Sequence, residues 1–409
     1  MSLYNDASLI LYPSGYKEDK LYSIKPTNGD GDFDFTRAST ATRVNSEGLI
    51  ETVATGVPRI DYTGGGCGKL LLEPQRSNLV TYSEQFDNAY WTKSNSSVVS
   101  GFASPDGTAN AFKLVENTST SAHNVFRNSS TVTLEEYSFS CFVKTNGRNV
   151  KLDFFGGTNN AIFNLTTGVV ISTNGTGLTA KIETLSNGWY RCSINQLQTS
   201  TTIYPNILCV DGSNNSTYTG DGTSGVYIYG AQLEASSYPT SYIPTLASSV
   251  TRLADAASKT GISSLINSTE GVLYIETKGF IDVPSSSGYI QLSKNGESSA
   301  DNSLVIQHRN NGFLRIYVNG FGTPDIQFNQ NIDFTENHKI AVLYKLNGYK
   351  LFIDGVEKPL YLTPTQSVFS GLDNLSFDLR GSLGWSGNIK EAKLYNNGLT
   401  DQELIALTS

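Results

Sequence analysis

Short apolar runs that alternate with polar residues recur along the chain, and they predict β-strands. In the run from residue 313 to 318, Leu314, Ile316 and Val318 fall on one face of an extended chain. Asn-Gly and Asp-Gly pairs separate such runs, and these pairs suit the positive φ angles of tight hairpin turns. Residues 339–353 thus predict a hairpin about Asn347-Gly348. Because helical periodicity is almost absent, we expect a nearly all-β protein.

The density of strands predicts two jelly-roll-like β-sandwiches in tandem behind an extended N-terminal arm. Residues 1–77 are rich in Gly, Pro, Thr and Arg, and their apolar pieces are too short to form a core alone. Residues 78–245 predict the first sandwich, 246–269 a linker and 270–409 the second sandwich. A chain of 409 residues is too long for one such core.

A short helix is expected at the C-terminal end of the second sandwich. Thr400 and Glu403 have the spacing of a capping box, in which each side chain bonds the other residue's backbone N–H. Leu404, Ile405 and Leu407 follow and are expected to dock the helix onto the sandwich.

The composition agrees with strands and limits the possible partners. The chain has 38 Gly, 22 Tyr and 19 Phe but one Met, and only 16% of its residues are charged. Its net charge of −8 argues against nucleic acid or an anionic membrane as a partner, since both need a basic surface. The first residues show no signal-peptide pattern, and no run approaches the roughly 18 apolar residues of a membrane span. We expect a protein that is neither exported by an N-terminal signal nor inserted into a membrane.

No catalytic motif stands out. The glycine-rich run 64–69 lacks the first glycine and the hydroxyl residue of a phosphate-binding loop. The three histidines lie in no recognisable nucleophile or metal setting, and there is no G-x-S-x-G turn. Spacing alone leaves a carboxylate pair for glycoside hydrolysis open, because a sandwich can bring distant residues together. We expect a protein that is not an enzyme.

Metal ligands are equally sparse. Asp30, Asp32 and Asp34 imitate the start of a calcium loop, but Phe35 stands where the loop needs glycine. The four cysteines lack zinc-ligand spacing, and Cys141 is expected in the core. An improvised calcium site is the one cofactor that this sequence leaves open.

The three tryptophans are candidates for stacking on sugars. Trp189 opens a strand and is expected in the core, and Trp385 is expected to cover one end of the second sandwich. Trp91 lies beside Tyr90 on a loop-like stretch, so these two residues are the predicted glycan-stacking pair.

Several long motifs resemble proteins of tailed bacteriophages. The runs 35–49, 57–62 and 71–79 resemble the N-terminal part of phage fibre and head spike fibre proteins. The runs 82–86, 187–191 and 229–234 are similar to the carbohydrate-binding-module type of jelly roll in that family. The runs 351–355 and 387–395 resemble a laminin-G or concanavalin-A-like sandwich. The resemblance covers nearly the whole chain.

The resemblance implies a structural virion component, a head or tail fibre protein assembled in the host cytoplasm, with lectin-like sandwiches for host adhesion. It implies a homo-oligomer, expected to be a trimer, whose arm attaches to other virion proteins and whose sandwiches bind surface glycans. The residues expected to make the attachment are the apolar, aromatic and basic ones of the arm, namely Leu21, Tyr22, Phe33, Phe35, Arg37 and Arg43. A bacterial glycan-binding protein and a capsule depolymerase are the alternatives. Location on capsid or tail, the host and the sugar stay open.

Overall fold

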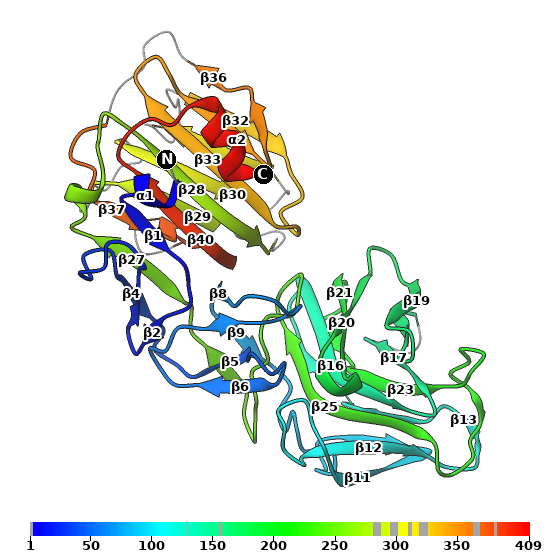
Figure 1. Ribbon diagram of the computed structural model, residues 1–409. Coiled ribbons are helices and arrows are strands. Elements are labelled where there is room, and N and C mark those ends of the chain that lie inside the picture. The colour runs from blue at the N-terminus through cyan, green and yellow to red at the C-terminus, as the bar shows by residue number, and fades with distance from the viewer. Residues whose placement is uncertain are drawn as a thin grey trace.

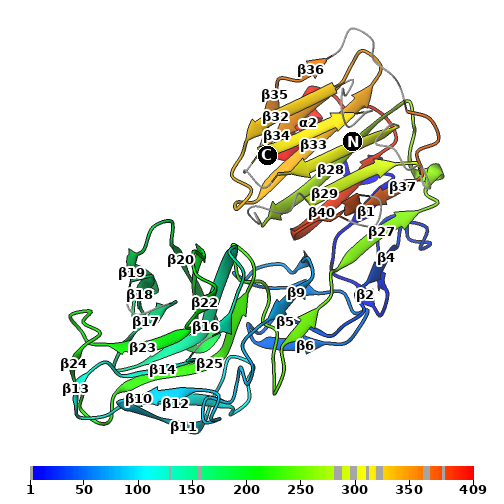
Figure 2. The same cartoon turned by 180° about the vertical axis from the view of Figure 1, so that it is seen from behind.

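The computed structural model describes residues 3–128, 130–154, 158–280, 288–294, 302–309, 313–318, 326–362, 369–379 and 383–409. These residues form two β-sandwiches with short helices, which confirms the prediction of a nearly all-β protein (Figure 1). Both chain ends lie on the second sandwich, as Figure 2 shows from behind. The helices are α1 (Leu3–Asp6), α2 (Asp401–Thr408) and the 3-10 turns η1 (Ser186–Gly188) and η2 (Ser263–Leu265).

The first sandwich packs two antiparallel sheets of six strands each. One sheet runs in the order β10 (Thr92–Ser94), β14 (Asn124–Phe126), β23 (Asn206–Val210), β17 (Asn149–Asp153), β18 (Asn160–Asn164) and β19 (Val169–Asn174). The other runs β11 (Ser96–Phe102), β12 (Ala111–Glu116), β25 (Gly225–Glu234), β16 (Glu136–Asn146), β21 (Tyr190–Leu197) and β20 (Thr179–Thr184). Short ladders join β13 (Thr120–Ser121) to β24 (Tyr218–Thr219) and β15 (Ser130–Thr131) to β22 (Thr202–Ile203). Alternation in β16 sends Phe139, Cys141 and Val143 into the shared core, which confirms the prediction for Cys141.

The second sandwich also has two sheets, of eight and ten strands. The first runs β35 (Val356–Lys358), β34 (Lys350–Ile353), β33 (His338–Lys345), β28 (Glu270–Gly279), β40 (Gly387–Tyr395), β8 (Lys69–Leu72) and β7 (Ile60–Asp61), and β1 (Leu9–Leu11) also pairs with β40. The second runs β2 (Tyr16–Lys17), β3 (Lys20–Leu21), β4 (Phe33–Thr36), β27 (Ala256–Thr260), β37 (Asn374–Ser376), β29 (Gly288–Ser293), β30 (Ser303–His308), β31 (Phe313–Val318), β32 (Ile326–Asn331) and β36 (Tyr361–Leu362). A ladder of β38 (Asp378–Leu379) and β39 (Leu383–Gly384) lies beside it. The predicted hairpin is present as β33 and β34, with Asn347 at φ 58° in its turn.

The prediction of a separate N-terminal arm is wrong, because this segment is part of the second sandwich. Strands β1, β7 and β8 complete one sheet of the second sandwich, and β2, β3 and β4 extend the other. Their side chains form part of the core of that sandwich. The prediction failed because each of these strands is only two to four residues long. A strand this short is stabilised by pairing with strands distant in the sequence, and the alternation of its own residues does not reveal that pairing.

The predicted linker 246–269 is likewise part of the sheets. Strand β26 (Val250–Arg252) pairs with β9 (Arg76–Asn78), and β27 lies between β4 and β37 in the ten-stranded sheet. A further hairpin, β5 (Ala41–Val44) with β6 (Ile50–Val53), precedes β7. The chain therefore enters and leaves the first sandwich through paired segments.

The C-terminal helix α2 forms with the predicted capping box between Thr400 and Glu403. Leu404 and Leu407 are buried on the outer face of the eight-stranded sheet. Ile405 was expected to dock as well, but it is 43% exposed, because only one face of a helix of two turns can meet the sheet.

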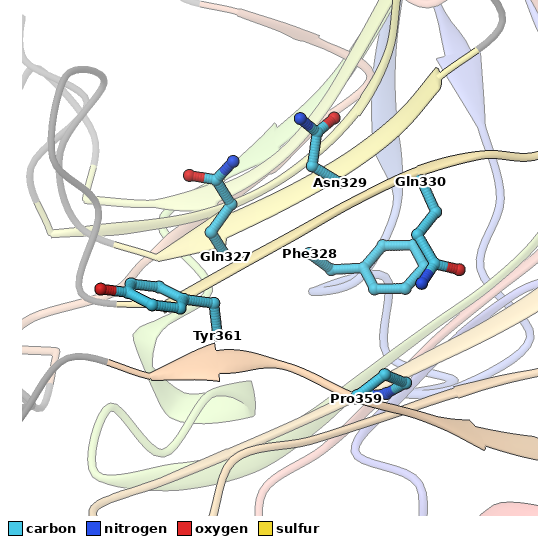
Figure 3. A pocket seen from close by; sticks show the side chains of 6 residues that line it. All are labelled: Gln327, Phe328, Asn329, Gln330, Pro359 and Tyr361. Atoms are coloured by element: carbon cyan, nitrogen blue, oxygen red, sulfur yellow. The ribbon is translucent and has the colours of Figure 1, made fainter.

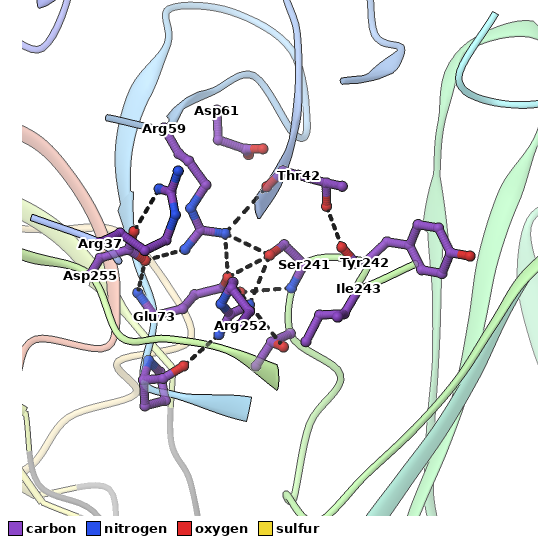
Figure 4. Close-up of polar contacts among 12 residues, drawn as sticks. Arg37, Thr42, Arg59, Asp61, Glu73, Ser241, Tyr242, Ile243, Arg252 and Asp255 are labelled. Carbon is purple, nitrogen blue, oxygen red and sulfur yellow. Dashed lines mark hydrogen bonds and ion pairs between the residues drawn. The ribbon is translucent and has the colours of Figure 1, made fainter. Parts of the chain in front are cut away.

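A buried ionic cluster, here called the joint, links the N-terminal segment to the start of the second sandwich (Figure 4). Asp255 accepts hydrogen bonds from Arg37, at 3.1 Å, and from Arg59. Glu73 lies 2.6 Å from Arg59 and 2.7 Å from Arg252. All five side chains are buried. Burial alone would raise the pKa of Glu73, but the guanidinium groups of Arg252 and Arg59 lower that pKa to about 2.

The joint also reaches the segment that leaves the first sandwich. The backbone N–H and the hydroxyl of Ser241 donate to Glu73 at 2.8 and 2.7 Å. The hydroxyl of Thr42 donates to the carbonyl of Tyr242 at 2.5 Å. The joint therefore ties both sandwiches to the N-terminal segment through charge-assisted hydrogen bonds.

Candidate functional site

A shallow groove lies beside the last two strands of the ten-stranded sheet. Alternation along β32 points Ile326 and Phe328 into the core, where each is 2% exposed. The same alternation places Gln327 and Asn329 on the opposite face. Tyr361 in β36 lies directly across from Gln327 in the antiparallel register. The local fold thus sets an aromatic ring beside two amides.

The groove has a volume of about 300 Å³. Figure 3 shows Gln327 and Asn329 projecting from the same side of β32, with Tyr361 on the neighbouring strand. Tyr361 is 70% exposed, the largest value for any large apolar side chain among the described residues. The lining residues are Gln327, Phe328, Asn329, Gln330, Pro359 and Tyr361.

The chemistry of the groove is neutral. None of its lining residues is charged, and the amides of Gln327, Asn329 and Gln330 make no side-chain hydrogen bond to any residue that the structure describes. Each amide therefore keeps two donors and one acceptor for a ligand. An exposed ring beside free amides suits a ligand with both C–H faces and hydroxyl groups.

The predicted glycan-stacking pair lies elsewhere and is not a platform. Trp91 is 1% exposed, its ring lies 5.0 Å from Phe86, and its indole N–H donates to the carbonyl of Tyr82 at 3.0 Å. The prediction that Trp91 is exposed is therefore wrong. Tyr90 is half-buried and lies under the guanidinium of Arg127 at 4.5 Å. Trp91 was misplaced because it directly precedes β10 on a loop-like stretch, and its packing against Phe86 in the core is visible only in the folded chain.

Most of the predicted attachment residues are also inside the molecule. Leu21, Phe33 and Phe35 are fully buried in the core of the second sandwich, and Arg37 belongs to the joint. They cannot contact another virion protein in this fold, which corrects their assignment.

The two remaining attachment candidates reach the surface. Tyr22 is 37% exposed. Arg43 is half-buried, donates a hydrogen bond to the hydroxyl of Tyr16 at 2.8 Å and pairs with Glu51 at 3.4 Å. They do not form one surface with the buried members of the set.

Trp189 and Cys141 lie in the core, as the sequence predicts. Trp189 and Trp385 are buried, and so are Cys141, Cys192 and Cys209, while Cys67 is exposed. All four cysteines are free thiols. Burial raises the pKa of Cys141 to about 12, so its thiol stays protonated at neutral pH.

Metal-binding and membrane-spanning features were also sought in the described ranges. No group of three or more His, Cys, Asp or Glu residues there could hold a metal ion. No helix in the same ranges is long and apolar enough to cross a membrane.

One close pair of carboxylates bears on the question of catalysis. The hydroxyl oxygen of Tyr229 lies between them, 3.0 Å from a carboxylate oxygen of Glu84 and 3.1 Å from one of Asp106, and its one proton is shared by the two acceptors. Burial raises the pKa of Glu84. Burial would also raise the pKa of Asp106, but hydrogen bonds from Ser104 and Thr108 lower it. Hydrolysis of a glycoside needs room for the sugar between the two acids. Here the hydroxyl of Tyr229 fills that space. The pair is therefore better suited to holding the backbone around Glu84 and Asp106 in place than to catalysis.

Comparison with known proteins gives no family. No family model matches the chain, and no curated protein matches it. Among solved structures, it is similar to the sialidase module CBM40 of Ruminococcus gnavus bound to α2,3-sialyllactose, with 17% identity over 34% of this chain and 83% of that one and a TM-score of 0.29. Domain 4 of the Geobacillus stearothermophilus arabinanase AbnA, in complex with arabinotriose, has 14% identity over 42% and 82%, with a TM-score of 0.29. The NanB sialidase of Streptococcus pneumoniae has 18% identity over 37% of this chain and 26% of its own, with a TM-score of 0.30. Likenesses this distant carry no argument about function.

Proposed function

We propose that this protein binds neutral glycans through the groove of β32 and β36, without catalysing a reaction on them. The observation that carries the proposal is the exposed ring of Tyr361 beside Gln327 and Asn329, whose amides are unused by the described chain. A pyranose offers a C–H face to the ring and hydroxyl groups to the amides. Because no lining residue is charged, recognition would depend on these contacts rather than on ion pairs.

The motifs quoted from residues 35–79 support a place for this glycan-binding protein in the virion of a tailed phage, as a fibre or decoration protein on the capsid or the tail. With Leu21, Phe33 and Phe35 inside the core, attachment to other virion proteins would use the outer surface of the second sandwich rather than a free arm. Mass spectrometry of purified particles tests this part of the proposal. If the protein is absent from the particles and glycan binding is found in a bacterial cell-surface fraction instead, the bacterial glycan-binding alternative is favoured.

A glycan array probed with the full chain tests the binding. The best ligand is then titrated calorimetrically against the wild type and the variant Tyr361→Ala, which removes the ring but leaves the strands. We expect a loss of affinity of at least about tenfold, or roughly 1.4 kcal/mol. Tyr4→Ala removes a tyrosine that is 51% exposed on α1 and serves as the matched control.

Two outcomes would overturn the proposal. Equal affinity of Tyr361→Ala and the wild type would move the site away from the groove, and an array without any hit would remove glycan binding altogether. Release of shorter oligosaccharides during the titration would instead favour the depolymerase alternative.

A further inference from the structure

The groove beside β32 and β36 is lined by two exposed rings rather than one. Pro359 and Tyr361 are both exposed, whereas Leu360 between them packs against the core of the second sandwich. This alternation is that of an extended chain, and it places both rings on the same side. Residues two apart in an extended chain are separated by about 6.6 Å. That spacing is close to the length of one hexose ring.

Each ring has an amide beside it. The antiparallel register sets Gln327 directly across from Tyr361. The step from Tyr361 back to Pro359 runs in the same direction as the step from Gln327 on to Asn329 and Gln330, because the strands are antiparallel. In Figure 3, Tyr361 and Gln327 lie toward one end of the groove. Pro359 and Gln330 lie toward the other end, so the lining repeats along the strands.

We infer that the groove takes at least two consecutive sugars of a linear neutral glycan, with the sugar chain running parallel to β32 and β36. This inference rests on the proposed function of the groove. One hexose would stack on Tyr361 and bond to Gln327, and the next would lie against Pro359 and bond to Gln330. A single terminal sugar contacts one ring and its amide, whereas two linked sugars use both.

The form of the groove also favours a chain over a single sugar. Its lining comes from two stretches that run side by side, residues 327–330 and 359–361. No third segment of the described chain lines it. Sites for one small molecule typically enclose most of the surface of their ligand. A groove with a floor and no described cover instead gains affinity by contacting more units of a longer ligand.

Calorimetric titration of the full chain with sugars of increasing length tests the inference. The probes are monosaccharides, disaccharides and trisaccharides of three linear series, namely β-1,4-linked glucose, β-1,4-linked mannose and α-1,4-linked glucose. We expect the disaccharide of one series to bind at least about tenfold more tightly than its monosaccharide. Tyr361→Ala should weaken the binding of both. Pro359→Ala and Gln330→Ala should each weaken the disaccharide roughly fivefold and leave the monosaccharide unchanged.

Matched controls come from outside the groove. Pro244→Ala and Gln402→Ala change an exposed proline and an exposed glutamine, and both variants should bind like the wild type. Equal near-ultraviolet circular dichroism shows that every variant is folded.

Three outcomes would overturn the inference alone, provided that Tyr361→Ala still weakens binding of a glycan from the array. They are equal affinities for monosaccharide and disaccharide, an unchanged disaccharide affinity in Pro359→Ala and Gln330→Ala, and no binding of any of the three linear series. An array without hits, or a Tyr361→Ala variant that binds like the wild type, would remove the proposed function and the inference together. The two failures are therefore distinguishable.

Discussion

Replacing Asp255 with Asn should uncouple the two sandwiches. Asp255 lies in the joint and accepts hydrogen bonds from Arg37, Arg59 and the backbone N–H of Glu73. The substitution keeps the shape of the side chain but removes its negative charge. The joint would then hold the guanidinium groups of three arginines against the single carboxylate of Glu73.

The expected loss is large because these charges are shielded from water. Removing one partner of a buried ion pair typically costs about 3–5 kcal/mol, since the remaining charge stays buried without compensation. The entropy of unfolding is about 2.1 cal/mol/K per residue, which gives roughly 0.9 kcal/mol/K for the 409 residues of this chain. A loss of about 4 kcal/mol therefore lowers the melting temperature by about 5 °C if the chain unfolds as one unit.

Differential scanning calorimetry is the assay, because it reports both the melting temperature and the cooperativity of unfolding. We expect one transition for the wild type and two for Asp255→Asn, since the joint ties both sandwiches to the N-terminal segment. Lys181→Gln breaks an exposed ion pair with Glu183 and should change the stability by less than about 0.5 kcal/mol. An Asp255→Asn protein with an unchanged melting temperature and a single transition would refute the reasoning.

Three further predictions concern buried groups. Burial lowers the pKa of His308 to about 4, so its contribution to stability is complete above the unfolded pKa of about 6.5 and is lost as the pH falls toward 4, by up to about 3 kcal/mol. Urea unfolding should show this loss in the wild type but not in His308→Gln. A Cβ added at Gly288 would lie 2.1 Å from Nε2 of His308, so Gly288→Ala should lower the free energy of unfolding by about 1–3 kcal/mol in the same assay, and an unchanged value would contradict the packing. Trp91→Ala should cost about 3–5 kcal/mol while the folded variant keeps the wild-type affinity for glycan, and a loss of affinity would restore Trp91 as a sugar-binding residue.

Periodicity in the sequence was enough to predict the strands that lie inside each sandwich. Strand β31 is an example, because its alternation of apolar residues decides which face meets the core. The turns could also be predicted, since Asn347 and Asn187 adopt the positive φ that Asn-Gly pairs favour. Strands and turns of this kind can be predicted because the residues that cause them are neighbours in the sequence.

The place of the N-terminal strands could not be predicted in this way. Strand β1 pairs with β40, at the other end of the chain. Three apolar residues from Leu9 to Leu11 show that a partner is needed but not which edge supplies it. Arg37 was assigned to virion attachment for the same reason, because the carboxylate of Asp255 comes close to it only in the folded chain.

The groove was missed because amides are common throughout this sequence. Gln327 and Asn329 are distinguished only by the free space beside them and by Tyr361 across the strand pair. The alternation of apolar and amide residues in β32 was the one local signal, since it turns both amides away from the core.

The central claim is that a neutral sugar binds against Tyr361, and a crystal structure of the full chain with the best ligand from the array tests it most directly. The account predicts a pyranose ring stacked on Tyr361, with hydroxyl groups hydrogen-bonded to Gln327 and Asn329. A sugar bound on either face of the first sandwich, with the groove empty, would contradict it.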